Sequence, residues 1–148
     1  MKQLFILIFF FSILLVNVSC NKGNSTDPGS PASTDPAELI LGKWQLIKDS
    51  IITNHFAYSD GTIPTPGVYM GTANDYWLFQ SNSTVTIYEG GPVGTTAYQL
   101  ISGTHLLIPA MQWGDITIIT LDSHNFIWEK VMTSSSGGTY YRKAYLKK

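Results

Sequence analysis

Residues 39–47 read LILGKWQLI, and this stretch divides the sequence into two parts of different character. Residues 21–36 before it carry no large apolar side chain, whereas the chain after it holds short runs of β-branched and aromatic residues. Asp35 followed by Pro36 is typical of a helix start, so we expect one short helical turn over residues 36–41, with Asp35 as the N-cap. Gly42 should end this turn and release the chain into its first strand.

The chain beyond Gly42 reads as strands, because no later stretch keeps a 3.6-residue apolar period for three turns. Residues 54–70 are rich in turn residues and predict an extended loop or a weak strand. Ile47 interrupts the alternation of the first strand. In the strand expected over residues 115–121, the apolar phase shifts between Ile118 and Ile119, and this shift indicates a bulge or burial on two sides. The expected strands cover residues 43–53, 76–80, 84–88, 95–101, 105–108, 115–121, 125–132 and 139–146.

Short strands joined by tight turns predict an all-β fold. We expect an antiparallel up-and-down meander of about eight strands closed into a barrel over residues 37–148, with a β-sandwich as the alternative. The two differ in one respect that a structure can decide. A barrel pairs the first strand with the last by backbone hydrogen bonds, while a sandwich can leave them apart.

The N-terminus has the pattern of a signal peptide at residues 1–19, with a Lys at position 2 and an apolar run over residues 4–16. A membrane anchor helix is the alternative, but the run is short for a bilayer span. Cys20 is the only cysteine, and its place after this run resembles a bacterial lipobox, although Asn17 stands where Leu is usual. The resemblance implies cleavage before Cys20 and attachment of diacylglyceryl to its sulfur. A free or buried thiol is the alternative reading.

Residues 20–36 are expected to form a flexible tether between a lipidated Cys20 and the domain, because they have little apolar surface to bury. The predicted location is the cell envelope, as an outer-membrane lipoprotein on either face. Without residues 1–19 the chain has 8 basic and 10 acidic residues, a net charge of −2. This charge offers no basic excess for nucleic acid, and the sequence shows no polybasic patch for anionic lipid.

Three segments resemble the lipocalin-like lipoproteins of Bacteroidota-type bacteria: LGKWQL at 41–46, FQSNSTV at 79–85 and YRKAYLK at 141–147. The resemblance implies a Gly-x-Trp at the first strand, here Gly42 and Trp44, and a basic side chain from late in the chain across the indole. Arg142 is the only arginine. We therefore predict that it covers Trp44 in a cation–π contact that fastens the barrel. The alternative is an exposed Arg142 and a Trp44 that only fills the core.

The aromatic residues provide the remaining indication of function. In a small barrel such rings either fill the interior or line a pocket for one small apolar or amphipathic ligand. A filled barrel would instead suit a structural or protein-interaction module of the envelope, with a contact surface on residues 54–75. The ligand-binding candidates are Trp77, Phe79, Tyr98, Trp113, Trp128 and Tyr140.

No catalytic residue, metal ligand or cofactor site is expected. His55, His105 and His124 lack the close spacing of a zinc site, and the carboxylates are scattered, mostly at predicted turns. The sequence has no Gly-x-Ser-x-Gly elbow, P-loop or dinucleotide-binding glycine set. A hydrolase would require converging carboxylates or a His–Asp pair in a cleft.

Overall fold

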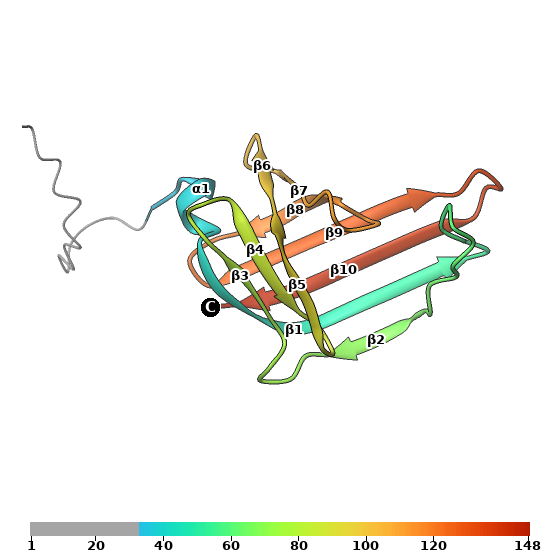
Figure 1. The fold of residues 1–148 in the computed structure, drawn as a ribbon, viewed down its shortest axis with the longest axis horizontal. Helices are drawn as coiled ribbons and strands as arrows, with labels where there is room; N and C mark the ends of the chain where they lie inside the picture. The colour runs from blue at the N-terminus through green and yellow to red at the C-terminus, as the bar shows by residue number, and fades with distance from the viewer. Residues whose placement is uncertain (1–32) are drawn as a thin grey trace, which may run out of the picture. The chain divides into compact units, whose positions relative to one another are not determined.

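The computed structural model describes residues 33–148, which form an all-β domain with one short helix (Figure 1). The predicted signal peptide, Cys20 and the tether as far as residue 32 lie outside the described residues. The elements are α1 (Pro36–Leu39), β1 (Gly42–Asn54), β2 (Gly67–Met70), β3 (Tyr76–Phe79), β4 (Thr84–Tyr88), β5 (Pro92–Ala97), β6 (Gln99–Ile101), β7 (His105–Leu107), β8 (Asp115–Leu121), β9 (Asn125–Thr133) and β10 (Thr139–Lys147).

The ten strand segments follow eight strand paths, because two pairs of segments are interrupted strands. β2 and β3 both pair antiparallel with β1, and residues 71–75 loop out between them. β5 and β6 are separated only by Tyr98; β5 pairs with β4 and β6 pairs with β7. This switch of partner at Tyr98 joins the two ends of the sheet, so the meander forms a nearly closed barrel, as predicted.

The first and last strands lie side by side, as the barrel prediction requires. β1 pairs antiparallel with β10 from Gln45 opposite Lys147 to Asn54 opposite Thr139. The order of strands in the sheet is β5-β4-β3-β1-β10-β9-β8-β7-β6, and β2 pairs with β1 off this path. The β-sandwich alternative is therefore wrong for this domain.

Both interruptions of the apolar pattern are bulges. The register of β1 against β10 shifts between Leu46 and Lys48, and that of β8 against β9 shifts between Ile118 and Thr120. The extra residue in each case, Ile47 or Ile119, is exposed. The bulge therefore lets the residues on both sides of it keep their apolar side chains directed into the core. At the second position the sequence left a bulge and burial on two sides open, and the register shift shows the bulge.

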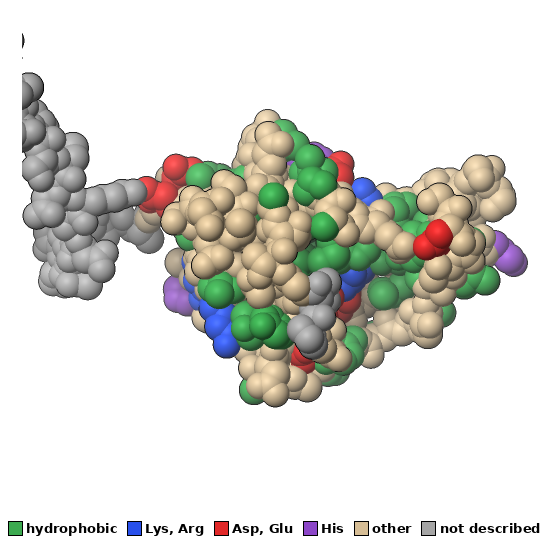
Figure 2. Space-filling view, viewed as in Figure 1, with side chains coloured by type: hydrophobic (Ala, Val, Ile, Leu, Met, Phe, Trp, Pro, Cys, Tyr) green, Lys and Arg blue, Asp and Glu red, His purple; other side chains and the backbone are tan. Residues whose placement is uncertain are grey.

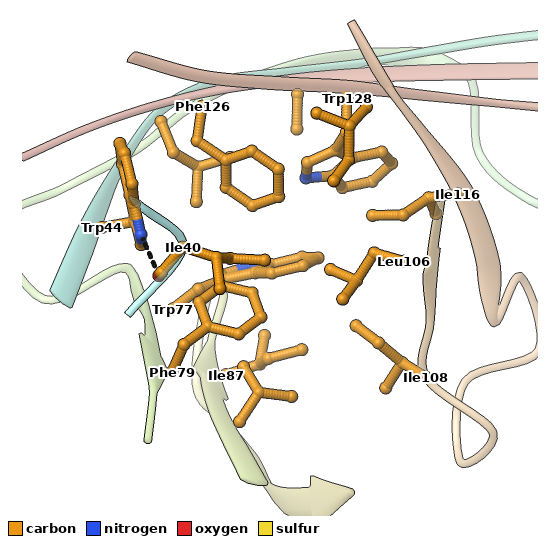
Figure 3. Packing of buried hydrophobic residues seen from close by; sticks show 14 of the residues in the cluster. Ile40, Trp44, Trp77, Phe79, Ile87, Leu106, Ile108, Ile116, Phe126 and Trp128 are labelled. Carbon is orange, nitrogen blue, oxygen red and sulfur yellow. Dashed lines mark hydrogen bonds between the residues drawn. The ribbon is translucent and has the colours of Figure 1, made fainter. Parts of the chain in front are cut away.

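The helical turn and the first strand meet at one end of the barrel. Asp35 is the N-cap of α1 and accepts a hydrogen bond from the N–H of Ala37, as expected. Gly42 has φ +101°, a conformation that side chains disfavour, and it starts β1. Beyond it the Trp44 indole N–H donates to the Ile40 carbonyl at 2.7 Å (Figure 3), so that Ile40 and Trp44 seal this end together.

Asp75 fixes the loop that interrupts the β2–β3 path. One carboxylate oxygen accepts hydrogen bonds from the Tyr69 hydroxyl and from the hydroxyl and N–H of Thr72, and the other accepts from the N–H of Gly90. The residue is 3% exposed. The Thr72 hydroxyl, followed by the two N–H groups, holds the pKa of Asp75 well below its usual range.

Replacing Asp75 with Asn should reduce the free energy of unfolding at pH 7 by about 1.5–3 kcal/mol, because a charged acceptor is lost. Since the folded-state pKa is depressed, the stabilisation is present above the ordinary value of 3.8 and disappears as the pH falls below it. Urea unfolding from pH 7 to pH 3 should therefore show wild type and Asp75→Asn converging. The exposed Asp115→Asn provides the control, and a difference that stays constant with pH would contradict this role for Asp75.

Candidate functional site

The predicted aromatic residues meet in the barrel interior. The Trp113 and Trp128 rings stack with centroids 5.2 Å apart, and Trp77 lies 5.4 Å from Trp128 and 6.0 Å from both Trp113 and Phe79. Figure 3 shows Trp77 and Phe79, both from β3, facing Trp128 of β9 across the core. Trp77, Phe79 and Trp128 are at most 1% exposed. The structure thus brings four of the six ring candidates into one packed core, and their part in ligand binding stays a prediction.

Arg142 points into the same core and does not cover Trp44. Its guanidinium carbon lies 4.5 Å from the centroid of the Trp113 ring and 5.2 Å from that of Trp128. The antiparallel register explains the difference from the prediction: Arg142 lies opposite Ile51, seven positions along β1 from Trp44. At about 3.3 Å per residue, the two side chains start about 23 Å apart.

Lys148 takes the place predicted for Arg142. Its ammonium nitrogen lies 4.4 Å from the centroid of the Trp44 ring and donates a hydrogen bond to the Leu39 carbonyl. Partial burial lowers the pKa of Lys148. A basic side chain from the end of the chain therefore does lie across the first-strand indole, and it belongs to the residue that directly follows β10.

Arg142 of β10 is linked through two carboxylates to β1 and to the end of β4. Its Nε and Nη2 atoms donate to Asp49 Oδ2 at 2.9 and 2.6 Å, and Nη2 also donates to Glu89 Oε2 at 2.6 Å. Glu89 accepts the Trp77 indole N–H through its other oxygen, at 2.7 Å. Although burial opposes the charged form, Glu89 and Asp49 raise the pKa of Arg142 overall, so the guanidinium stays charged.

This ion cluster supports the fold rather than acid–base chemistry. Arg142 and Asp49 are only 7% and 6% exposed, and both carboxylates are engaged by the one guanidinium. The second oxygen of Asp49 is buried without a hydrogen-bond partner among the described residues. The sequence missed Asp49 and Glu89 because they lie 40 residues apart and converge only through Arg142.

The barrel end away from α1 is covered by an aromatic group in which the sequence predicted Tyr140 but missed Phe56 and Tyr58. Tyr140 packs against Phe56 and Tyr58, with ring centroids 5.4 and 5.9 Å apart. Burial raises the pKa of the Tyr140 hydroxyl, which keeps it protonated. The loop that carries Phe56 and Tyr58 is tied across this end by a hydrogen bond from Gln112 Nε2 to Asp60 Oδ2 at 2.9 Å.

A cleft of about 660 Å³ opens beside this aromatic group, and we call it the mouth cleft. Its lining combines aromatic, alanine and methionine side chains with the hydroxyl groups of serine and threonine and one glutamine amide. In Figure 2 this end, on the right, presents mostly uncharged polar surface with hydrophobic side chains between the loops. The residues that line the mouth cleft are Phe56, Ala57, Tyr58, Ser59, Gln112, Met132, Thr133, Ser134, Ser135 and Ser136.

Of the six ring candidates, Tyr98 borders a separate, smaller cavity. This cavity of about 350 Å³ lies at the end that carries α1, beside Ile40 and Leu100. The Tyr98 ring packs edge-on against Phe79 at 5.0 Å, so it also belongs to the point at which β5 passes into β6. Tyr140 covers the core below the mouth cleft without being part of the cleft lining.

Titratable groups elsewhere in the described domain form no cleft site. His105 and Asp115 approach to 3.5 Å, but both side chains are about half exposed on neighbouring strands β7 and β8. Within residues 33–148 no three His, Cys, Asp or Glu side chains gather as a metal site would require. The same residues include no helix long and apolar enough to cross a bilayer.

No protein-family model matches the chain, and no curated protein is significantly similar to it. Among solved structures, the domain is similar to a bovine odorant binding protein, a deswapped triple mutant. The sequences are 13% identical, the match covers 72% of each chain, and the TM-score is 0.40. The barrel assignment rests on the strand pairing of this chain itself, and membership of the lipocalin-like lipoproteins stays a prediction.

Proposed function

We propose that this protein is a non-catalytic binding module that takes one small, uncharged, amphipathic molecule in the mouth cleft. The volume and lining of that cleft carry the proposal. About 660 Å³ is in the range of small-molecule sites, and the lining combines aromatic and thioether surface with serine hydroxyls and the Gln112 amide. It includes no Lys, Arg, Asp or Glu side chain, which favours an uncharged ligand.

The packed interior supports a site at the barrel end rather than inside it. Trp77, Trp113 and Trp128 contact one another and leave their volume filled. A ligand in the mouth cleft would lie against Phe56 and Tyr58, which themselves rest on the core through Tyr140. The aromatic core then acts as a rigid support for the site, which limits the entropy that binding must overcome.

The same proposal places the protein at the cell envelope through a lipid on Cys20. The motive is the position of the single cysteine at the end of an apolar N-terminal run. Mass spectrometry of the protein from membranes should detect an acylated Cys20 at the N-terminus. Recovery of an N-terminal residue other than Cys20, or an unmodified thiol, would contradict this part of the proposal without affecting the mouth cleft.

Binding in the mouth cleft can be tested by filling it. Ser135 lines the cleft and is exposed, so Ser135→Trp should occupy part of the volume without disturbing the core. We expect Nile red, a neutral amphipathic dye, to bind the wild-type protein and to bind Ser135→Trp about tenfold or more weakly, a change of about 1.4 kcal/mol. Fluorescence titration measures both affinities, and native mass spectrometry can search for a co-purified ligand.

Thr104→Trp provides the matched control, since Thr104 is exposed in the β6–β7 turn, which lies beside Pro36 at the barrel end that carries α1. Its affinity for the dye should equal that of the wild type. If all three proteins bind the dye equally, or if none binds it, the mouth cleft is not the site.

A protein-interaction module is the second candidate, and one observation favours it. β2 pairs only with β1 among the described strands, and its Val68 and Tyr69 side chains are 62% and 39% exposed. These residues belong to the contact surface expected on residues 54–75. Tyr58, which lies in the same range, is instead partly buried against Phe56.

A further inference from the structure

Charge is distributed unevenly over the barrel wall. Residues 33–148 include seven basic and nine acidic side chains, and all seven basic ones lie on β1, β9, β10 or the C-terminal residue. Four of them face outward on β1 and β10: Lys43, Lys48, Lys143 and Lys147. Glu129 is the only carboxylate that β1, β2, β9 and β10 present on this outer side, so the surface carries a net charge of +3 on a domain with an acidic excess.

The strand pairing assembles this surface from residues that are far apart in sequence. Lys48 of β1 lies opposite Tyr145 of β10, and Ser50 lies opposite Lys143. Both lysines approach the Tyr145 ring, at 5.9 and 5.6 Å from its centroid. None of the four outward lysines has a carboxylate within 4 Å among the described residues. The sequence showed no polybasic patch because the patch exists only across strands.

Exposed apolar side chains alternate with these lysines. Ile52, Val68, Met70 and Val131 are each 60–64% exposed. Ile52 and Val131 flank Tyr141 in one row across β1, β10 and β9, while Met70 lies opposite Lys48. A groove of about 420 Å³ runs on the same side and is bordered by Ile47, Met70 and Tyr145. We call this outer side of β2, β1, β10 and β9 the lysine face.

We propose that the lysine face docks on an anionic phospholipid surface. Apolar side chains that protrude between unpaired lysines fit a bilayer interface, where the side chains enter the headgroup region and the ammonium groups meet lipid phosphates. The inference is independent of the mouth cleft and of acylation at Cys20. It assigns a membrane contact to the folded domain itself.

Charge and exposed apolar side chains favour an anionic lipid surface over a second copy of the chain or nucleic acid. A second copy of the chain would bring one +3 surface against another in a two-fold contact, which like-charge repulsion disfavours. Nucleic acid would meet the same lysines, but Ile52, Val68, Met70 and Val131 protrude between them, and these apolar side chains make no contact with a phosphate backbone. An acidic protein shares the charge complementarity, and the experiment below separates it from lipid.

The test uses a probe that reports on the face alone. In the full chain with Cys20→Ser, Ser50→Cys is labelled with an environment-sensitive NBD dye at the centre of the lysine face. We expect a blue shift and a rise in emission with phosphatidylcholine vesicles containing about 30 mol% phosphatidylglycerol, and neither with pure phosphatidylcholine. About 0.5 M NaCl should abolish the response, because it shortens the Debye length to about 4 Å.

Two charge variants with the same net change provide the comparison. Lys48→Gln with Lys143→Gln removes two charges from the lysine face and should raise the vesicle concentration needed for half the signal by about tenfold or more. Ser81→Glu in the β3–β4 turn with Thr95→Glu on β5, both exposed and outside the lysine face, lowers the net charge equally and should change this vesicle concentration by less than about twofold.

Other outcomes would overturn the proposal. They are no response at the Ser50 site, an equal response to pure phosphatidylcholine, or an equal response from a dye placed at Thr95 outside the lysine face. If both charge variants weakened vesicle binding equally, the net charge of the protein would explain the effect, and the proposal for the lysine face would also be overturned. A response to polyglutamate without a response to vesicles would identify an acidic protein as the occupant of the lysine face.

Discussion

Arg142→Ala is expected to lower the free energy of unfolding by about 3–5 kcal/mol. The substitution leaves Asp49 and Glu89 as two like charges in a protein interior, where the guanidinium had supplied every charge-assisted hydrogen bond to Asp49 Oδ2. It also removes the cation stacked between those carboxylates and the Trp113 and Trp128 rings. Urea unfolding followed by tryptophan fluorescence measures the change directly.

A neutral replacement of the whole cluster provides the control. Arg142→Met combined with Asp49→Leu and Glu89→Gln removes all three charges and retains an acceptor for the Trp77 indole N–H. We expect it to recover most of the stability that Arg142→Ala loses, because a buried ion cluster rarely exceeds a well-packed apolar substitute in stability. A triple variant as unstable as Arg142→Ala would assign the loss to packing volume instead.

The fold could be predicted from the sequence because each strand carries its own signal. Val85 and Ile87 alternate with outward residues in β4, and the structure buries both fully. The helix start at Asp35 and the shift at Ile119 are likewise local events, set by capping and by side-chain phase. Up-and-down order then follows from short connections between neighbouring strands.

The contacts between strands could not be predicted in the same way, because they depend on register. A basic partner for Trp44 was a sound expectation, but the choice of Arg142 over Lys148 required the offset of β10 against β1. Similarly, Ile47 and Lys48 both face outward only because a bulge separates Leu46 from Lys48 in the pairing. A shift of the pairing register by one residue changes which side chains lie on the same face of the sheet.

The mouth cleft was hidden for a different reason. Phe56 and Tyr58 lie in a turn-rich segment without alternation, so periodicity gave no sign that their rings pack on Tyr140. A loop residue becomes part of a core only when the loop folds back, and the Asp60–Gln112 hydrogen bond that holds this loop spans 52 positions. Large aromatic residues in an otherwise polar loop were the one available signal.

Trp77→Ala should have an effect at least as large as that of Arg142→Ala. Removing a fully buried indole costs about 3–5 kcal/mol in transfer and cavity terms. The same change leaves Glu89 Oε1 without its donor, which adds about 1 kcal/mol for a partly buried acceptor that loses its partner. Total losses of this size approach the whole stability of a small domain, so Trp77→Ala is expected to be largely unfolded at 25 °C by circular dichroism.

Two Trp→Phe variants separate the hydrogen bond from the volume. Trp77 and Trp128 are equally buried in the same ring cluster, but only the Trp77 indole N–H has a partner; that of Trp128 has none among the described residues. Trp128→Phe therefore loses volume while removing an unsatisfied donor, and Trp77→Phe loses the same volume while orphaning Glu89. We expect Trp77→Phe to be the less stable of the two by about 1–3 kcal/mol in urea unfolding. Equal losses in the two variants would mean that the Trp77–Glu89 hydrogen bond contributes nothing, and that Glu89 is held in the barrel by Arg142 alone.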